Sequence, residues 1–263
     1  MKQYAEVMKV THIRQVAVSI SGWMRQVSDS AGAAGGVFGV SGGLDSALLV
    51  ALAKDAWQEN CLGLVLPCHS SQTDVSDAIY VLEHFDCRYK VLDLTPVYDC
   101  FISTLEESEG ESGFMARANL KPRLRMAALY YYANMMNYMV VGTTNRSEYH
   151  IGYFTKYGDG GVDLLPLAIL TKTEVRQLSK VLGVPDRILA KTPSGGLWEG
   201  QTDEGEMGLS YTDLDAYLRG EKVSETVRKK IADMHRKSEH KRNLPPIPAH
   251  VIHLIKGDFT KGE

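Results

Sequence analysis

The sequence contains few cysteines and no long hydrophobic run. Its 263 residues include four cysteines, none in a Cys-x-x-Cys pair. A disulfide framework or a zinc site is therefore not expected, and free thiols in a reducing compartment fit better. No uncharged apolar run approaches the roughly 18 residues of a membrane span, and the N-terminus lacks the apolar segment of a signal peptide. We therefore expect a cytoplasmic protein without a membrane span.

The chain also lacks a strong excess of either charge. Its 29 Lys and Arg residues are matched by 32 Asp and Glu residues, which gives a formal net charge of −3. Such a near-neutral chain gives no reason to expect nucleic acid as a partner. Its 44% of hydrophobic residues excludes a mainly disordered chain. A chain of this length buries a core without disulfides or metals, so we expect one domain over residues 1–263.

Apolar runs alternate with segments of helical periodicity along the chain. This alternation predicts an α/β fold with a Rossmann-like, doubly wound parallel sheet and extra helices toward the C-terminus. The expected strands are 37–40, 61–66, 88–94 and 138–142. The expected helices are 4–28, 44–60, 73–85, 95–107, 119–137, 171–182, 211–218 and 223–239. Connection rules place the first strand beside the fourth, with ligands at their carboxyl ends.

Four segments are expected to lie outside this regular structure. Residues 147–163 are rich in glycine, and residues 106–113 are acidic. Residues 191–208 contain five glycines, and such a long connection indicates a mobile or functional loop. The prolines of 240–248 should end the preceding helix.

A glycine- and serine-rich segment follows the first expected strand. Residues 41–46 read Ser-Gly-Gly-Leu-Asp-Ser and lead into an expected helix. Glycines let the backbone approach a ligand, and backbone N–H groups before a helix form an anion site. Asp45 would repel a phosphate unless it carried a bridging cation. The segment therefore favours a phosphate site, with Asp45 as a simple helix cap as the alternative.

The same segment allows a serine hydrolase as another alternative. Residues 39–43 match the Gly-x-Ser-x-Gly nucleophile elbow, with Ser41 as the nucleophile. Against this interpretation, one expected strand precedes Ser41, and the sequence contains no His-Gly-Gly-Gly oxyanion segment. The Walker loop and the Gly-x-Gly-x-x-Gly motif are also absent.

A second polar segment follows the fourth expected strand. Residues 142–148 read Gly-Thr-Thr-Asn-Arg-Ser-Glu. Thr143 stands at the strand end, where it can contact a nucleotide, and Glu148 is placed to face Asp45 across the crevice. Two carboxylates together with phosphate oxygens suit Mg²⁺.

These motifs resemble those of a known family. Residues 41–46 resemble the pyrophosphate loop of the ATP pyrophosphatases, whose adenine nucleotide α-hydrolase-like fold the chain would share. Ammonia-dependent NAD⁺ synthetases are similar in the segments 142–148, 152–167, 170–178, 193–204 and 239–246. The similarity covers about residues 39–246. The usual glutaminase partner domain is missing, which implies free ammonia as the nitrogen donor.

The resemblance also implies roles for individual residues. Asp45 and Glu148 would hold Mg²⁺ and, with Lys172, carry the catalysis. The ATP site would consist of Gly39, Val40, Ser41, Gly42, Gly43, Leu44, Asp45, Ser46, Thr143, Lys172 and Ser194. The substrate deamido-NAD⁺ would contact Arg123, Lys156, Asp163, His240 and Lys241. Arg125 stays open as an alternative to Arg123, and a homodimer with the substrate site at its interface is implied.

The implied activity is that of a ligase. The enzyme would activate the nicotinate carboxylate with ATP and release AMP, pyrophosphate and NAD⁺. Asp159 and Asp163 are both open as the base that takes a proton from ammonium. The further alternatives are an adenylating enzyme for another substrate and a non-catalytic nucleotide-binding module.

Overall fold

The computed structural model describes residues 2–105, 111–198 and 200–248. Within them lies one parallel sheet with the strand order β3-β2-β1-β4. Val37 of β1 pairs with Leu62 of β2 on one side and with Val140 of β4 on the other. The predicted neighbourhood of the first and fourth strands is confirmed. The strands are β1 (Gly35–Gly39), β2 (Cys61–Val65), β3 (Tyr89–Val91) and β4 (Tyr138–Val140).

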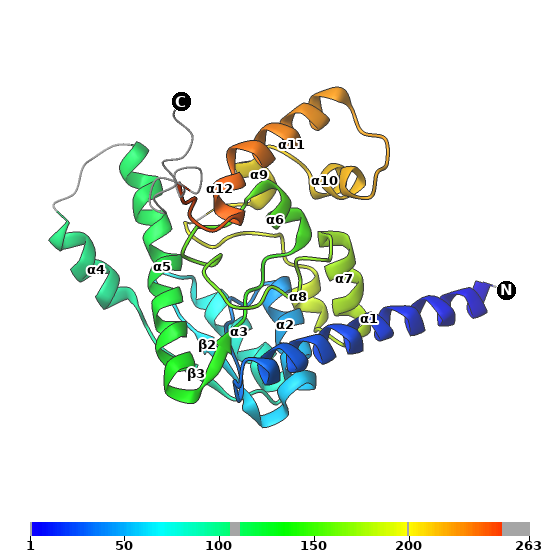
Figure 1. The fold of residues 1–263 in the computed structure, drawn as a ribbon, viewed down its shortest axis with the longest axis horizontal. Helices are drawn as coiled ribbons and strands as arrows, with labels where there is room; N and C mark the ends of the chain where they lie inside the picture. Colours follow the sequence, from blue (N-terminus) through cyan, green and yellow to red (C-terminus); the bar gives the residue numbers. More distant parts are fainter. Residues whose placement is uncertain (1, 106–110, 199, 249–263) are drawn as a thin grey trace, which may run out of the picture.

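Helices cover both faces of this sheet (Figure 1). The long helices lie close to the expected bounds, because their apolar positions recur at helical spacing. They are α1 (Lys2–Ser30), α2 (Leu44–Trp57), α3 (Gln72–His84), α4 (Thr95–Thr104), α5 (Glu111–Met136), α7 (Lys172–Val181), α10 (Tyr211–Leu218) and α11 (Glu225–Lys237). The short helices are η1 (Gln58–Asn60), α6 (Arg146–Ile151), α8 (Asp186–Leu189), α9 (Asp203–Met207) and α12 (Glu239–Arg242).

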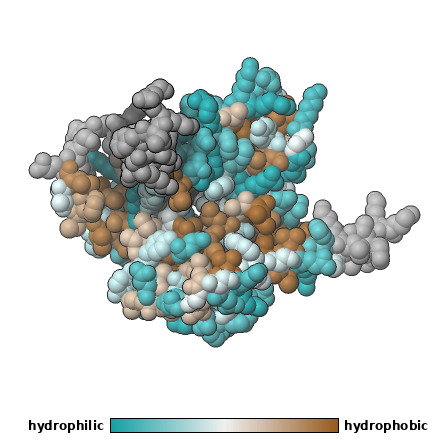
Figure 2. Space-filling view, in the orientation of Figure 1, coloured by the Kyte–Doolittle hydropathy of each residue, from teal (hydrophilic) through white to brown (hydrophobic). Residues whose placement is uncertain are grey.

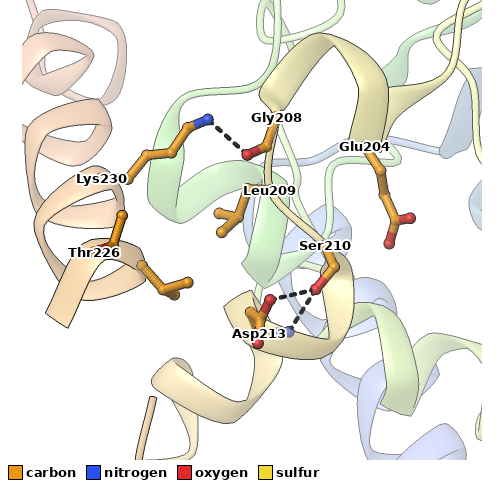
Figure 3. A pocket seen from close by; sticks show the side chains of 8 residues that line it. Glu204, Gly208, Leu209, Ser210, Asp213, Thr226 and Lys230 are labelled. Atoms are coloured by element: carbon orange, nitrogen blue, oxygen red, sulfur yellow. Dashed lines mark hydrogen bonds between the residues drawn. The ribbon is translucent and has the colours of Figure 1, made fainter. Parts of the chain in front are cut away.

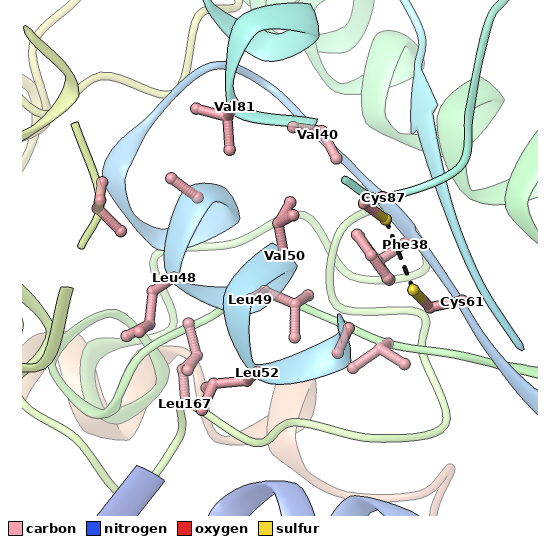
Figure 4. Packing of buried hydrophobic residues seen from close by; sticks show 14 of the residues in the cluster. Phe38, Val40, Leu48, Leu49, Val50, Leu52, Cys61, Val81, Cys87 and Leu167 are labelled. Atoms are coloured by element: carbon pink, nitrogen blue, oxygen red, sulfur yellow. Dashed lines mark hydrogen bonds between the residues drawn. The ribbon is translucent and has the colours of Figure 1, made fainter. Parts of the chain in front are cut away.

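Neighbouring residues of β1 point to opposite faces of the sheet. Phe38 packs with α1, α2, α3 and α7, whereas Val37 packs against Leu129 and Ala133 of α5. Figure 4 shows the first cluster, in which Leu49 of α2 lies on the side of the strand, whereas Leu48 and Leu52 lie nearer to Leu167. Alternation of this kind follows from the two-residue repeat of a strand. The sheet is therefore a central layer between two helical layers.

A third apolar cluster joins the C-terminal helices to the rest of the molecule. Ile151 of α6 packs with Met207 of α9, Leu214 of α10 and Ile231 of α11. α10 also packs against α7. This cluster brings the C-terminal helices next to the segments that follow β1 and β4. No helix among the described residues is long and apolar enough to cross a membrane.

Four local expectations are corrected by the structure. The glycine-rich 147–163 was expected outside regular structure, but its start lies in helix α6, which the capping box of Asn145 and Glu148 begins. Residues 106–110 of the acidic segment lie outside the described residues, but α5 begins at Glu111 rather than at 119 and continues through Pro122. The glycine-rich 191–208 contains α9, whose N-cap Thr202 accepts from Gly205 N. Residues 239–242 form one more helical turn, in which Arg242 donates to Ser238 Oγ over 2.8 Å. Gly113 and Pro122 interrupt the helical pattern of α5, and α6, α9 and α12 are too short for periodicity to mark them.

Candidate functional site

The segment after β1 folds over the N-terminus of α2. Gly42 has a φ of +76°, and a Cβ at this position would lie 2.5 Å from Asp74 O of α3. The Ser46 hydroxyl accepts from Ser41 N over 3.3 Å and donates to Gly43 O over 2.9 Å. The N-cap of α2, Gly43, offers no side-chain hydrogen bond. The first amides of α2 are thus left without a cap, which suits an anion.

The Asp45 carboxylate turns away from its own helix end and toward Lys172. Its Oδ2 lies 2.6 Å from Lys172 Nζ, and its Oδ1 accepts from Asn145 Nδ2 over 2.9 Å. Glu148 Oε1 lies 3.2 Å from the same ammonium. The three side chains are largely buried, with 16% (Asp45), 7% (Lys172) and 14% (Glu148) exposure. Asp45 and Glu148 thus both contact Lys172 Nζ, and the Asp45 carboxylate binds Lys172 and Asn145 rather than the N-terminus of α2.

Two capping boxes position Glu148 and Lys172. Asn145 accepts from Glu148 N over 3.0 Å, and Glu148 Oε2 accepts from Asn145 N over 3.3 Å. Thr171 and Glu174 make the equivalent box at the start of α7, which places Lys172 in the first turn. Each box satisfies amides that a helix N-terminus leaves open. Both functional side chains are thereby fixed at helix ends.

Burial and charge shift the pKa values of this cluster. Burial raises the pKa of Glu148 to about 7; the carboxylates of Asp45 and Asp203 add to this effect, and Lys172 opposes it. Burial alone would lower the pKa of Lys172, but Asp45 and Glu148 outweigh it and raise that pKa. The pKa of Asp203 is raised, mainly by burial. The cluster thus carries an excess of negative charge that one ammonium only partly balances.

A second layer of side chains surrounds Glu148. The Tyr211 hydroxyl lies 3.0 Å from Glu148 Oε1 and 2.8 Å from Asp203 Oδ2. Tyr153 donates to Glu206 Oε2 over 2.7 Å and lies 3.3 Å from Asp203 Oδ1. Burial raises the pKa of the Tyr211 hydroxyl, as do the carboxylates beside it. Tyr211 therefore stays protonated, and its single proton can be donated to either of the two carboxylates that it contacts.

Sequence reasoning missed several of these residues. A signal for Asn145 was present, because Asn-x-x-Glu before a helix is a capping-box pattern. Asp203 and Tyr211 belong to α9 and α10, which no sequence pattern places next to β4. The meeting of these residues with Glu148 depends on the third apolar cluster.

The remaining predicted nucleotide contacts lie in loops. Thr143 follows β4 and is half-buried. Ser194 is exposed and accepts from Gly196 N over 3.2 Å. The loop around Ser194 is tied to α5, because Lys121 Nζ donates to Leu197 O over 2.8 Å and Trp198 contacts Phe114 edge-on.

The predicted substrate residues fall into three groups. Lys156, His240 and Lys241 lie together: Lys156 Nζ donates to His240 O over 2.6 Å, and Lys241 Nζ donates to the Phe154 carbonyl over 2.7 Å. Arg123 is exposed on α5. Asp163 stands apart, because its carboxylate accepts from Val140 N over 2.8 Å and from Tyr130 OH over 2.9 Å. These last contacts fix the end of β4.

The structure distinguishes Arg125 from Arg123. Arg125 Nε donates to Leu66 O over 3.0 Å, and Arg125 Nη2 donates to Ser70 Oγ over 3.3 Å. Burial lowers the pKa of this guanidinium. Arg125 therefore holds the end of β2, which leaves the exposed Arg123 as the better placed of the two for a ligand.

The donor set at Asp45 and Glu148 fits a magnesium ion. Two carboxylates from different parts of the chain converge on one point, where the Lys172 ammonium now supplies positive charge. Among the described residues no group of three or more His, Cys, Asp or Glu side chains forms a metal cage. Mg²⁺ commonly uses one or two carboxylates and completes its shell with phosphates and water. The pair is thus suited to a cation that arrives with a nucleotide.

The serine hydrolase interpretation lacks support in the geometry. Ser41 Oγ lies 3.2 Å from Ser46 Oγ and accepts from Gly43 N over 3.3 Å. Neither partner is a base that could activate a nucleophile.

A surface hollow of about 350 Å³ lies between α9, α10 and α11, with Leu209 and Lys230 in its wall (Figure 3). None of the predicted site residues lines it.

Comparisons with known proteins identify the family of this chain. The family model described as NAD synthase matches residues 16–245. The NH(3)-dependent NAD(+) synthetase of Syntrophomonas wolfei is 51% identical over 229 residues, which are 86% of this chain and 92% of that protein.

Solved structures of an NMN synthetase and of an NAD synthetase share the fold of this chain. NMN synthetase from Francisella tularensis matches with a TM-score of 0.85 and 37% identity, over 90% of this chain and 98% of that one. The NH3-dependent NAD synthetase of Campylobacter jejuni matches with a TM-score of 0.73 and 28% identity, over 89% and 98% of the two chains. The chain that brings Asp45, Lys172 and Glu148 together at the β1–β4 switch point therefore belongs to the NAD synthase family.

Proposed function

We propose that this protein is a ligase that amidates deamido-NAD⁺ with ammonia and ATP to give NAD⁺, AMP and pyrophosphate. The observation that carries the proposal is the cluster of Asp45, Lys172 and Glu148 beside the uncapped N-terminus of α2. Ammonia as the donor is supported by the printed names of the relatives, which are NH(3)-dependent.

In the first step the substrate carboxylate would attack the α-phosphorus of ATP. A bond forms between carboxylate oxygen and phosphorus, and the bond to pyrophosphate breaks. The amides of residues 42–46 and the Lys172 ammonium would hold the phosphate oxygens, with Gly39, Val40, Thr143 and Ser194 contacting the rest of ATP. Bound between Asp45 and Glu148, Mg²⁺ would supply charge neutralisation for the leaving group. In the nucleotide complex Lys172 would exchange its carboxylate partners for phosphate.

In the second step ammonia would attack the carbonyl carbon of the adenylate. A carbon–nitrogen bond forms, the bond to AMP breaks, and one proton leaves the nitrogen. We place deamido-NAD⁺ against Arg123, Lys156, Asp163, His240 and Lys241. Asp159 accepts from Thr155 N over 2.8 Å within the same loop, and together with Asp163 it stays a candidate base. Closure of the connections 152–163 and 191–198 would keep water from the adenylate.

A second candidate substrate is nicotinate mononucleotide, the acid that corresponds to NMN. The structure of NMN synthetase from Francisella tularensis matches this chain with a TM-score of 0.85, compared with 0.73 for the NAD synthetase of Campylobacter jejuni. The acyl chemistry is the same for both acids. The two substrates differ in whether the adenylyl half is present, so their relative kcat/KM decides between them.

The experiment that tests the proposal is a product analysis. Purified protein receives ATP, Mg²⁺, ammonium and either acid, and NAD⁺ or NMN, AMP and pyrophosphate are measured by chromatography. We expect equal amounts of the three products with ammonium and no amide product with glutamine. Asp45→Asn should abolish pyrophosphate release, whereas Asp86→Asn, whose side chain is 98% exposed, should not. No consumption of ATP would refute the proposal.

We also propose a cytoplasmic homodimer with the substrate site at its interface. Large apolar side chains are exposed on α4 and α5, and Figure 2 shows brown surface over α4 at the left. They include Val97, Phe101, Phe114, Met115, Tyr131 and Met135. Exposed apolar patches of this kind are typical of interaction surfaces. Sedimentation should give a dimer that Met135→Lys weakens and Val18→Lys on α1 leaves intact; a monomeric wild type would contradict this.

A further inference from the structure

Two residues of α10, one helical turn apart, reach the elements that carry Glu148 and Lys172. Tyr211 and Asp215 are four positions apart and therefore lie on the same face of the helix. α10 packs against both α6 and α7. Asp215 is completely buried, with 0% exposure. A buried carboxylate that accepts no hydrogen bonds would destabilise the fold.

Asp215 joins α6 to α7 through hydrogen bonds. Its Oδ1 accepts from Ser147 Oγ over 2.5 Å. Its Oδ2 accepts from Thr173 N over 2.8 Å and from Thr173 Oγ1 over 2.6 Å. Ser147 Oγ in turn accepts from Lys172 N over 3.1 Å. The residues bound here are the immediate neighbours of Glu148 and Lys172.

Tyr211 acts on the side chains themselves. Its hydroxyl lies 3.0 Å from Glu148 Oε1, and the Lys172 ammonium lies 5.0 Å from the centroid of its ring. One face of α10 thus contacts the backbone next to Glu148 and Lys172 through Asp215, and the side chains of the two residues through Tyr211. The negative charge of Asp215 also lies at the N-terminus of α7, where the helix dipole favours it.

We propose that Asp215, assisted by Tyr211, is a positioning residue that sets the separation of Glu148 and Lys172 before ligands bind. The inference rests on the proposed function, in which this pair meets the cation and the phosphates of ATP. Without Asp215, α6 and α7 keep their apolar packing but lose the bonds that fix their N-termini relative to one another. Glu148 and Lys172 then reach their positions only when ligands bind, so the affinity for the cation is lower.

The test compares Asp215→Asn with Asp213→Asn on the same helix. Asp213 lies in the first turn of α10, where its Oδ2 accepts from Ser210 Oγ and its N–H donates to the same hydroxyl, the N-cap of the helix; neither bond reaches α6 or α7. Supporting groups of metal ligands typically change metal affinity or activity by about 10–100-fold. We expect Asp215→Asn to lower kcat by about that factor, with KM for the dinucleotide within about threefold. Mn²⁺ affinity, measured by electron paramagnetic resonance with a non-hydrolysable ATP analogue, should fall about tenfold.

The outcomes separate positioning from a structural role. A lower melting temperature with kcat and Mn²⁺ affinity equal to those of Asp213→Asn would overturn the proposal. If Asp215→Asn does not fold, Tyr211→Phe removes a single hydroxyl, and it should weaken Mn²⁺ binding while circular dichroism is unchanged. Unaltered Mn²⁺ binding by a folded Tyr211→Phe then counts against the proposal. Wild-type protein that binds Mn²⁺ and nucleotide but forms no amide would refute the proposed function. The effect of Asp215→Asn on Mn²⁺ affinity would still test the positioning role.

Discussion

Asn145 and Asp45, which are 100 positions apart in the sequence, are joined by a hydrogen bond of 2.9 Å between Nδ2 and Oδ1. The same Asn145 side chain accepts from Glu148 N. One buried residue therefore connects the two carboxylates that we assign to the cation, because the backbone N–H of Asn145 also donates to Glu148 Oε2 over 3.3 Å. The Nδ2 of Asn145 faces the segment 41–46, and its Oδ1 caps α6.

Replacing Asn145 by alanine should damage both stability and activity. Loss of an N-cap costs about 1 kcal/mol, and loss of the bond to Asp45 adds about 1 kcal/mol or more. We expect a drop of roughly 2 kcal/mol in the free energy of unfolding and at least about a tenfold loss of kcat. Urea titration and steady-state kinetics measure both. Ser224→Ala removes the N-cap of α11 far from the cluster and should cost stability alone; equal loss of activity in both variants would contradict the role of Asn145.

Gly42→Ala should disturb the loop between β1 and α2. A φ of +76° disfavours alanine by about 1–2 kcal/mol, and the added Cβ would lie 2.5 Å from Asp74 O. The loop has to move, so KM for ATP should rise at least about tenfold. Gly32→Ala is the matched control, because its φ is +66° and nothing lies within 4 Å of its Cβ position. An unchanged KM for ATP in Gly42→Ala would show that this loop does not bind the nucleotide.

The stability of the metal-free protein should depend on Glu148. Since burial raises the pKa of Glu148 from 4.5 to about 7, the folded chain between these pH values holds a proton that the unfolded chain has released. Stability therefore falls as the pH rises through this window. With about 1.4 kcal/mol for each pKa unit, the effect is at most on the order of 3 kcal/mol. Urea titration at pH 4.5 and pH 7.5 should show a smaller decrease for Glu148→Gln; identical pH profiles would contradict the assignment.

His150 should act in the opposite direction. Burial, together with His235, Arg242 and Arg146, lowers its pKa from 6.5 to about 4. Its ring is stacked on that of His235, with 4.3 Å between centroids. The unfolded chain takes up a proton first, so stability is lost as the pH falls from 6.5 to 4. Because the ring is partly exposed, we expect about 1–2 kcal/mol. His150→Gln should flatten the acid side of the stability profile; an unaltered slope would exclude this histidine as its source.

The sequence predicted the framework of the site better than its surroundings. The pairing of β1 with β4 follows from connection rules, and the two polar segments after these strands therefore had to meet. Lys172, although more than 120 positions from Asp45, was identified through the resemblance. The prediction of the strand pairing succeeds because short segments with fixed backbone roles carry it.

The predictions fail where side chains meet through tertiary packing alone. Tyr211 and Asp215 lie on a helix of eight residues whose pattern shows a buried face but not what covers it. α9 is five residues long and lies within a glycine-rich stretch, which local patterns identify as a loop. Asp163 was predicted from the resemblance as a substrate contact. Its bonds to Val140 N and Tyr130 were not predictable, because they depend on the crossing of α5 and the end of β4.

The residues of the cluster lie far apart in the sequence, so they leave the ribosome at different times during synthesis. The ribosome delivers Asp45 early, but its partners Asn145 and Lys172 follow about one hundred residues later, and Asp215 comes after them. Contacts between such distant positions form late because a long loop must first close. A nascent chain that ends after α6 therefore contains Asp45 and Glu148 without the Lys172 ammonium, and the proposed nucleotide site becomes complete only when α7 and α10 have emerged.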